Sequence, residues 1–219
     1  MYLKNSKIIV IKIGSSLLVN EKRNIRTKWL SSFAKDIKKL INMKKKIVIV
    51  SSGAIAIGCI KMKINKKSLK LDKSQAIASI GQIELMNLFT RTFSKVNLNI
   101  SQILLTLEDT EVRRRSLNAK RTMENLLDLN FIPIVNENDT TATSEIKYGD
   151  NDRLASRVAQ IIGADTLIIF SDVDGLFDRS NKIVKSVSRV DDKIYSMVRN
   201  EKNLLGSGGI STKIDAAKI

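Results

Sequence analysis

The sequence predicts an α/β protein in which helices cover an open, mostly parallel β-sheet. Short apolar runs rich in Ile and Val alternate along the chain with longer amphipathic stretches, which is the pattern of βαβ units. The apolar runs end in small or polar residues, as parallel strands do where their loops carry a binding site. A length of 219 residues, 43% of them hydrophobic, suffices for the core of one large domain.

The first part of the chain shows this alternation most clearly. Residues 8–13 are all Ile or Val except Lys12, and they predict a buried strand. Residues 29–41 repeat apolar side chains at helical spacing. Residues 47–50 predict a second buried strand, which ends in the small residues 51–53 and leads into another helix. Because ligands of open α/β sheets lie beyond the carboxyl ends of strands, these two strand ends are candidate site positions.

The middle of the chain continues the pattern. Residues 75–93 predict a helix, 100–105 a strand, 111–129 a helix and 131–135 a strand. The last of these strands stops at the polar sequence 136–139, so a third strand end carries polar side chains.

The last part begins with the polar, β-prone residues 140–148, which predict a hairpin. Residues 150–162 predict an amphipathic helix with an Asp/Asn-rich start, and 166–170 predict a strand that closes at 171–172. A further helix is expected to begin near Ser211. The sequence contains no internal repeat, linker or low-complexity segment.

Composition excludes several classes of chemistry. Histidine is absent and Cys59 is the single cysteine, which rules out histidine acid–base catalysis, histidine-dependent triads, Cys/His zinc sites and an internal disulfide. No apolar run approaches the roughly 20 residues that span a bilayer, and the N-terminus has no signal-peptide core. We therefore expect a cytoplasmic protein without a membrane partner.

The net charge of +16 raises the question of nucleic-acid binding. The excess is spread over separate segments, 35–46, 61–73 and 113–121, and aromatic residues that could stack on bases make up only 5% of the chain. Frequent Lys, Ile and Asn beside a single proline, Pro133, indicate a general compositional bias. A nucleic-acid partner is therefore disfavoured.

Two strand ends are candidates for anion binding. Lys12 lies inside an apolar strand, where it is either a surface lysine with a buried stem or a charge that belongs to a site. Gly14 and the serines that follow it make a loop small enough for backbone N–H groups to approach an anion. Residues 51–56 precede a helix N-terminus that suits a carboxylate or phosphate, or else form a plain tight turn.

A third candidate is the glycine-rich sequence 206–213, GSGGISTK, at the expected start of a helix. It suits polyphosphate, but Lys213 follows the hydroxyl residues, whereas the P-loop places its lysine before them. A Walker-type enzyme is therefore disfavoured. A flexible loop between two units would also be rich in glycine.

The fourth candidate combines carboxylates and amides at 136–139 and 150–152. Such groups bind an ammonium, orient a lysine or reach Mg²⁺ through water, although Asp150 alone also fits a helix N-cap. The sequence 172–175, DVDG, lacks the remaining ligands of a calcium loop. Two lysines, a glycine-rich loop and carboxylates together suggest phosphoryl transfer, which needs no histidine.

These segments, in this order, resemble the amino acid kinase family and, within it, the glutamate 5-kinases. The matching sequences run along nearly the whole chain: VIKIGSS (10–16), VSSGAIAIG (50–58), SLNAKRT (116–122), IPIVNEND (132–139), EIKYGDNDRLA (145–155), SDVDGLF (171–177) and GSGGISTK (206–213). The SSGAIA, NEND and GDND strings distinguish this branch from acetylglutamate kinase, aspartokinase and uridylate kinase.

The resemblance implies a three-layer αβα sandwich, with a substrate half over residues 1–163 and a nucleotide half over 164–219. It implies transfer of the ATP γ-phosphate to the side-chain carboxylate of L-glutamate, the first step of proline biosynthesis, with Mg²⁺ held mainly by the nucleotide phosphates. No protein metal site is expected. Proline as a feedback inhibitor, a homo-oligomer and hand-over of the product to glutamate-5-semialdehyde dehydrogenase are further expectations of the resemblance.

The resemblance also implies roles for individual residues. The catalytic positions are Lys12 and Lys213, which would stabilise the transferring phosphoryl group, and Asp152, which would hold both lysines. The glutamate-binding positions are Ser52, Asp139 and Asn151. The nucleotide-binding positions are Ser171, Asp172, Ser207, Gly208, Gly209, Ile210, Ser211, Thr212 and Lys213.

Two departures from the family pattern leave alternatives open. Nothing in the chain corresponds to the C-terminal PUA domain of many relatives, and the chain ends at Ile219, where the family's last helix and further strands would continue. The C-terminal part of the domain is therefore expected to be missing. An amino acid kinase with another acceptor, such as acetylglutamate or aspartate, and a non-catalytic protein that binds glutamate or proline are the alternatives.

Overall fold

The computed structural model describes residues 2–65, 69–142, 151–198 and 209–219, and its centre is a five-stranded sheet. The strands lie in the order β3-β4-β2-β1-β5, and every adjacent pair is parallel. The strands are β1 (Ile8–Ile13), β2 (Lys46–Ser51), β3 (Asn99–Leu105), β4 (Phe131–Glu137) and β5 (Thr166–Phe170). All carboxyl ends therefore meet at one edge of the sheet.

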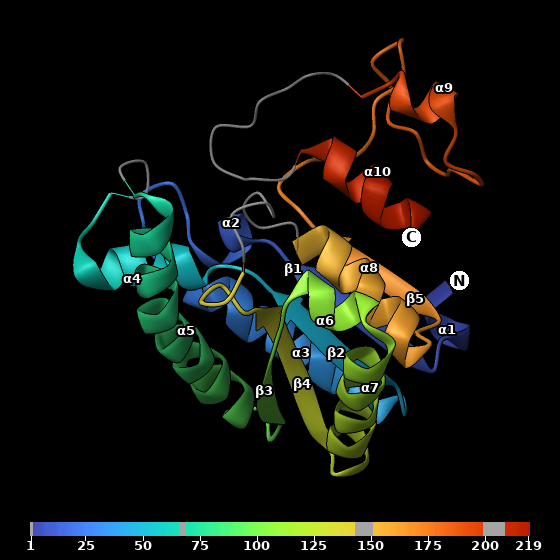
Figure 1. Ribbon diagram of the computed structural model, residues 1–219. Helices are drawn as coiled ribbons and strands as arrows, with labels where there is room; N and C mark the ends of the chain where they lie inside the picture. Colours follow the sequence, from blue (N-terminus) through green and yellow to red (C-terminus); the bar gives the residue numbers. More distant parts are fainter. Residues whose placement is uncertain (1, 66–68, 143–150, 199–208) are drawn as a thin grey trace.

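Helices cover both faces of this sheet, which gives three layers (Figure 1). The longer helices are α3 (Thr27–Asn42), α4 (Ala54–Met62), α5 (Leu71–Ser94), α7 (Arg113–Asp128), α8 (Asn151–Ile162) and α10 (Ile210–Lys218). The shorter ones are α1 (Tyr2–Asn5), α2 (Ser15–Leu18), α6 (Leu107–Glu111) and α9 (Asp192–Tyr195). The α/β class and the parallel sheet predicted from the sequence are confirmed.

The two faces of the sheet carry separate apolar cores. On one face Leu30 of α3 and Phe89 and Phe93 of α5 pack against the isoleucines of β1 and β2. On the other face Met123 of α7 and Val158 of α8 pack against the valines of the same strands. Because successive side chains of a strand point to opposite faces, the Ile/Val runs of β1 and β2 fill both cores at once. This double burial fixes the central strands and hence the positions of their ends.

Helices α4 and α5 cross in direct backbone contact, and two glycines make that contact possible. A Cβ built on Gly81 would lie 1.8 Å from the carbonyl oxygen of Ala54, and one on Gly58 would lie 2.2 Å from that of Ile77. Since α4 follows directly after β2, the crossing ties the loop at the end of β2 to the long helix α5.

We expect Gly81→Ala to lower the free energy of unfolding by roughly 3 kcal/mol, because helices packed this closely must separate to admit a methyl group. Urea unfolding followed by circular dichroism measures the change. Ser79→Ala, an exposed site on the same helix, is the matched control and should stay within about 0.5 kcal/mol. Equal stability of the two variants would contradict the close crossing.

The predicted helix over residues 111–129 is wrong at its start. Thr106 and Asp109 form a capping box, in which the Asp109 carboxylate accepts from the Thr106 backbone N–H at 2.8 Å and Thr106 Oγ1 accepts from the Asp109 N–H at 3.2 Å. A separate short helix, α6, therefore begins directly after β3. Val112, with an extended backbone (φ −75°, ψ 114°), separates α6 from α7.

Three other differences concern shorter segments. Strand β4 continues to Glu137, so Asn136 belongs to the strand and not to the loop after it. Of the hairpin predicted over 140–148, only residues 140–142 lie inside the described part, where they follow a turn. Helices α1, α2 and α9 have four residues each, which is too short to produce a readable helical period.

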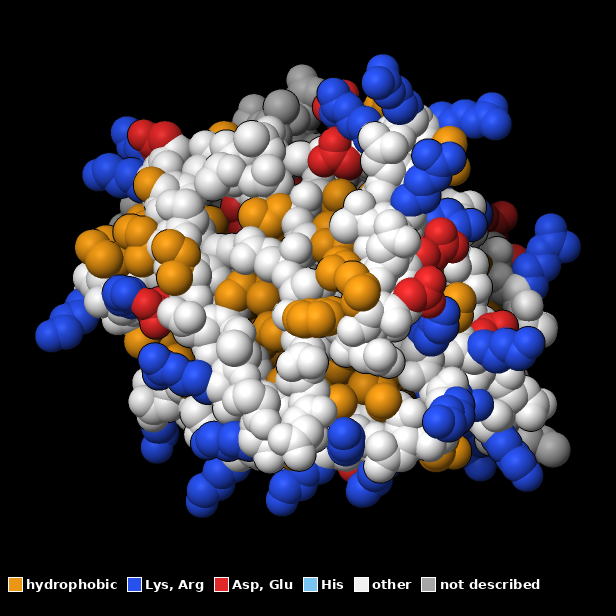
Figure 2. All heavy atoms as spheres, turned by 90° about the horizontal axis from the view of Figure 1, so that it is seen from below, with side chains coloured by type: hydrophobic (Ala, Val, Ile, Leu, Met, Phe, Trp, Pro, Cys, Tyr) orange, Lys and Arg blue, Asp and Glu red, His pale blue; other side chains and the backbone are white. Residues whose placement is uncertain are grey.

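The basic residues are spread around the molecule. On the face seen from below in Figure 2, Lys and Arg side chains stand separately around the rim, and apolar side chains are exposed in the middle. This face offers no continuous basic stripe of the kind that follows a nucleic-acid backbone. Among the residues that the structure describes, no helix has the length and apolar character needed to cross a membrane.

Candidate active site

Lys12 is a buried cation at the carboxyl-end half of the central strand β1. Only 8% of the residue is exposed, and its Nζ lies 2.5 Å from Oδ1 of Asp152. Burying an ammonium without a counter-charge is strongly unfavourable, so the pair explains how a lysine can occupy this strand. Of the two interpretations that the sequence left open for Lys12, the structure therefore excludes the surface lysine with a buried stem.

Asp152, in the first turn of α8, binds two lysines at once. Its Oδ2 lies 3.2 Å from Nζ of Lys213 and accepts a hydrogen bond of 2.9 Å from Thr212 Oγ1, while Oδ1 faces Lys12. Lys213 also donates to the Gly209 carbonyl oxygen at 3.4 Å, and Thr212 Oγ1 lies 3.0 Å from the same oxygen. One carboxylate thus joins β1 to the start of α10.

The electrostatics of this cluster favour an ionised aspartate. Burial raises the pKa of the Asp152 carboxyl. Three partners lower it: Lys12 by its charge and hydrogen bond, Lys213 by its charge, and Thr212 by a hydrogen bond from its hydroxyl. The three partners outweigh burial, so the pKa lies below its ordinary value. Two positive charges around one negative charge leave the cluster with a net positive charge, which suits a phosphate.

Two further contacts place α10 beside α8. Ser156 of α8, itself buried, donates from Oγ to the Ala216 carbonyl oxygen at 2.7 Å. Tyr195 of α9 donates from its hydroxyl to Asp215 Oδ1 at 2.9 Å. Because α10 is held at both points, Lys213 reaches Asp152 from a fixed helix.

The space in front of Lys12 is bounded by glycine. A Cβ on Gly14 would lie 3.8 Å from Lys12 Nζ and 3.7 Å from both the Phe170 carbonyl oxygen and Ser16 Oγ, so Gly14 leaves its backbone beside the ammonium group. A loop of this kind lets an anion approach both the lysine and nearby backbone N–H groups.

A second group of polar side chains lies at the ends of β2 and β4. Asn151, the residue before Asp152, places its Nδ2 2.7 Å from Ser52 Oγ, 2.9 Å from the Ser51 carbonyl oxygen and 3.0 Å from Asn136 Oδ1. Asn151 is 4% exposed, so these bonds are made away from bulk water. Two adjacent residues of α8 thus serve two different clusters.

The turn from β2 into α4 brings Ser52 to this position. Gly53 has a φ of +113°, a conformation that side chains other than hydrogen rarely allow, and it is the N-cap residue of α4. The turn is therefore tight, and Ser52 stands at the end of the strand beside the first turn of the helix.

Asp139 lies in the turn that follows β4 and is half-buried. Contacts on either side hold this turn: the Asn138 N–H donates to the Leu105 carbonyl oxygen at 2.9 Å, and Gln75 of α5 donates from Nε2 to the Ala142 carbonyl oxygen at 3.0 Å. The carboxylate is thus carried by a loop attached both to the sheet and to α5.

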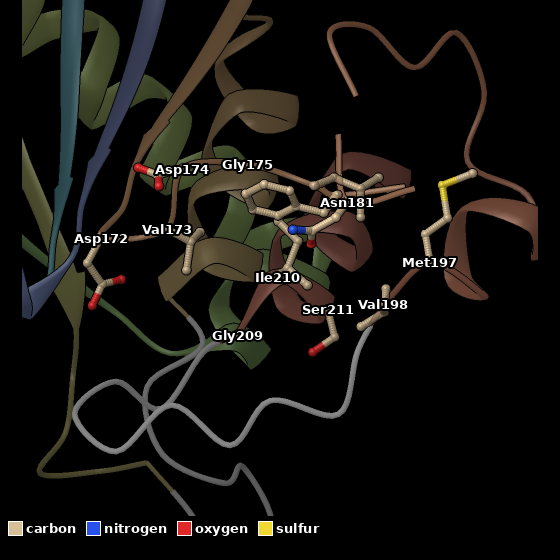
Figure 3. Close-up of a pocket in the computed structure, with 12 residues that line it drawn as sticks. Asp172, Val173, Asp174, Gly175, Asn181, Met197, Val198, Gly209, Ile210 and Ser211 are labelled. Atoms are coloured by element: carbon tan, nitrogen blue, oxygen red, sulfur yellow. The ribbon is translucent and has the colours of Figure 1, made fainter. Parts of the chain in front are cut away.

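A pocket of about 280 Å³ opens between the loop after β5 and the start of α10 (Figure 3). Its lining comes from residues 172–177 and Asn181 after β5, Met197 and Val198 after α9, and residues 209–211 at the start of α10. Carboxylate, amide, hydroxyl and backbone groups are mixed with apolar side chains in this lining, a combination that can accommodate a nucleotide.

The predicted nucleotide residues fall into three sets. Asp172, Gly209, Ile210 and Ser211 line the pocket, and Ser171 is joined to Asp172 by a 3.3 Å hydrogen bond. Thr212 and Lys213 instead contact Asp152. Ser207 and Gly208 lie outside the described residues, and so does Asp150.

One known protein family matches nearly the whole of this chain. A model of the amino acid kinase family matches residues 7–219. The chain belongs to the amino acid kinase family. The family predicted from the sequence is thus confirmed. Lys12, Asp152 and Lys213 all lie within the matched residues.

Several curated relatives of this chain share the name glutamate 5-kinase. A protein named glutamate 5-kinase from Pelagibacter ubique is 66% identical over 225 residues, which cover 100% of this chain and 61% of the relative. Another of that name from Nitrobacter hamburgensis is 46% identical over 226 residues, covering 100% of this chain and 60% of the relative. The chain therefore spans about three fifths of the length of these curated relatives.

Among solved structures, a UMP kinase from Bacillus anthracis is similar in fold. It is 17% identical, with a TM-score of 0.52, and the match covers 78% of this chain and 68% of that chain. At this identity the likeness concerns the fold alone, and it agrees with the three-layer arrangement of the amino acid kinase fold described above.

One residue that contacts this group, Gln82, is not predicted as a site residue from the sequence, whereas its partner Asn136 belongs to the fourth candidate. Asn136 Nδ2 donates to Oε1 of Gln82 at 2.8 Å, and both side chains are buried. The signal for Gln82 is a polar residue on the apolar face of α5, between Ala78 and Leu85 at helical spacing. A buried amide on such a face needs a partner, and that partner lies on β4.

Proposed function

We propose that this chain carries the acceptor site and part of the nucleotide site of an ATP-dependent kinase that phosphorylates the side-chain carboxylate of L-glutamate. The products are glutamyl 5-phosphate and ADP, the first step of proline biosynthesis. The observation that carries this proposal is the junction at the start of α8, where Asp152 binds Lys12 and Lys213 while its neighbour Asn151 binds Ser52. A phosphate-binding cluster and an acceptor cluster are thereby adjacent.

In the proposed reaction a carboxylate oxygen of glutamate attacks the γ-phosphorus of ATP. The new oxygen–phosphorus bond forms as the bond from the γ-phosphorus to the bridging oxygen breaks, and that electron pair leaves with ADP. Lys12 and Lys213 stabilise the negative charge on the transferring group and on ADP, and Asp152 keeps both ammonium groups in place. A carboxylate is ionised at neutral pH, so no protein base is needed.

The acceptor side uses the second cluster. Ser52 and Asn151, held together by a 2.7 Å hydrogen bond, provide polar groups for glutamate, and Asp139 provides a negative charge for its ammonium group. The positions of these residues at the ends of β2 and β4 agree with the expected site of open α/β folds.

The nucleotide side is the pocket between the loop after β5 and α10. The backbone N–H groups of residues 209–211, at the N-terminus of α10, are available to the phosphates, and Asp172 lies at the pocket wall. No group of three or more acidic, cysteine or histidine side chains within the described ranges suits a metal ion. In this proposal Mg²⁺ is carried mainly by the phosphate oxygens of ATP, as is usual where Mg²⁺ accompanies a nucleotide.

The test is ADP release by the 219-residue chain with Mg-ATP and L-glutamate, with hydroxylamine present to trap an acyl phosphate as the hydroxamate. Aspartate, acetylglutamate and no acceptor are the comparison arms. Glutamate-dependent ADP release with stoichiometric hydroxamate supports the proposal. Release with a different acceptor would identify another amino acid kinase, and nucleotide binding without any release would identify a binding protein.

We also infer three properties of the working protein from its relationship to glutamate 5-kinases: inhibition by proline, a homo-oligomeric state, and transfer of the product to glutamate-5-semialdehyde dehydrogenase. Addition of proline to the active chain and light scattering of the purified protein test the first two. Because glutamyl phosphate is an unstable acyl phosphate, a coupled assay with the dehydrogenase tests the third. A cytoplasmic location, where both substrates are present, belongs to the same proposal.

A further inference from the structure

A chain of three side-chain amides runs through the buried part of the acceptor cluster. Asn151 Nδ2 donates to Asn136 Oδ1 at 3.0 Å, and Asn136 Nδ2 donates to Gln82 Oε1 at 2.8 Å. The three residues are 4%, 2% and 8% exposed and come from α8, β4 and α5. This chain links helix α5 to the residue that binds Ser52.

The direction of this chain is fixed at one end. The Ser51 carbonyl oxygen can only accept, and it lies 2.9 Å from Asn151 Nδ2, so Asn151 must present its nitrogen on that side. Asn136 must then present its oxygen to Asn151 and its nitrogen to Gln82. It follows that Gln82 has to accept, and its Nε2 has no partner in the described part of the structure.

Asn136 can meet Asn151 in two ways that differ by a half-turn of its amide. With the oxygen towards Asn151 the contact is a hydrogen bond, and with the nitrogen towards Asn151 two N–H donors would face each other. The Gln82 oxygen reinforces the first arrangement at the other end, because it gives Asn136 Nδ2 an acceptor there. Without Gln82 the Asn136 amide loses this second contact and is held in this chain at the Asn151 end alone.

We propose that Gln82 is a positioning residue of the acceptor site: its side-chain oxygen orients Asn136, and through Asn136 it orients Asn151 and Ser52 towards the acceptor. This inference rests on the proposed function, in which Asn151 and Ser52 bind glutamate. Gln82 acts through the two asparagines, so its loss weakens acceptor binding and leaves the Lys12–Asp152–Lys213 cluster intact.

The position of Gln82 on α5 supports this role. Gly81, the preceding residue, is one of the two glycines at which α5 and α4 are in backbone contact, so α5 is packed closely at this level. Two helical turns earlier on α5, Gln75 binds the Ala142 carbonyl oxygen of the loop that follows Asp139. One helix thus holds both the asparagine chain and the neighbouring loop.

The test is steady-state kinetics of Gln82→Met, which keeps the length of the side chain and removes its acceptor. We expect KM for glutamate to rise about tenfold, while kcat and KM for ATP stay within about twofold of the unchanged chain. Thr92→Val is the matched control, because Thr92 is also a buried polar residue of α5 but bonds only to the Leu88 carbonyl oxygen of its own helix. It should leave all three constants unchanged.

A double variant separates positioning from general loosening of the fold. If Gln82 acts through Asn136, Gln82→Met should raise KM for glutamate no further in the Asn136→Ala background than Asn136→Ala does alone. The inference would be overturned if the two substitutions raised KM for glutamate independently, so that their effects multiplied in the double variant. An unchanged KM for glutamate in Gln82→Met would also overturn it. If the wild-type chain showed no glutamate-dependent turnover, that result would instead contradict the proposed function itself.

Discussion

Lys12→Met is expected to reduce glutamate-dependent ADP release by roughly 1,000-fold, the scale at which a charge that stabilises a phosphoryl transition state acts. The variant removes a buried cation and keeps most of the apolar stem in the core around β1. Asp152 retains Lys213 and Thr212 as partners, so no carboxylate is left uncompensated and the fold should persist. Turnover with hydroxylamine trapping measures the loss, and circular dichroism checks the fold.

The matched control for this variant is Lys46→Met. Lys46 opens the neighbouring strand β2, is half exposed, and pairs with Asp128 at 2.8 Å on the surface. Its removal takes away one positive charge and one ion pair but should leave turnover within about twofold, because exposed pairs contribute little. If both variants retained turnover within about tenfold of the unchanged chain, Lys12 would have no role in phosphoryl transfer.

The fold was predictable wherever a local pattern decided the structure. The strands β1 and β5 have the predicted boundaries because their apolar residues pack into the cores on the two faces of the sheet, most of those in β1 buried and most of those in β5 partly buried. Helix α6 was missed because its five residues are too few to show a helical period and its start is marked by the capping box of Thr106 and Asp109. Hydrogen bonds at element ends are weaker sequence signals than apolar periodicity.

The candidate site was predictable only in part, since its contacts join distant parts of the chain. The sequence alone left Lys12 open between two interpretations, because its partner Asp152 lies 140 residues later and on another element. The resemblance to amino acid kinases supplied the grouping of Lys12, Asp152 and Lys213. Gln82 was missed by both routes, since its role depends on which side of α5 faces the end of β4.

Asp152→Asn is expected to lower the free energy of unfolding at neutral pH by roughly 3 kcal/mol. The substitution removes the one negative charge between Lys12 and Lys213, so a buried ammonium group loses its counter-charge. Urea unfolding at pH 7 measures the difference. Asp36→Asn is the matched control, because Asp36 forms an exposed pair with Lys39, and it should change stability by less than about 0.5 kcal/mol.

The pH dependence of this difference tests its electrostatic cause. The pKa of Asp152 is lower in the folded chain than in the unfolded chain, where a value of about 3.9 is expected. The unfolded state therefore binds the proton first as the pH falls, so the stabilisation is complete above about pH 4 and is lost as the pH drops through the folded pKa. The pKa of Asp165 is also lowered, by the backbone N–H groups of Ile8 and Lys7. Its protonation therefore lowers the stability of both proteins at acid pH to the same extent.

We therefore expect the stability curves of the unchanged chain and Asp152→Asn to run parallel from neutral pH down to about pH 5 and to converge below about pH 4. The contribution of Asp165 cancels in the difference between the curves, which isolates Asp152. Curves that stay parallel through the acid range would assign the loss in Asp152→Asn to packing. Convergence would establish that Asp152 holds the two lysines by charge, as the proposed function assumes.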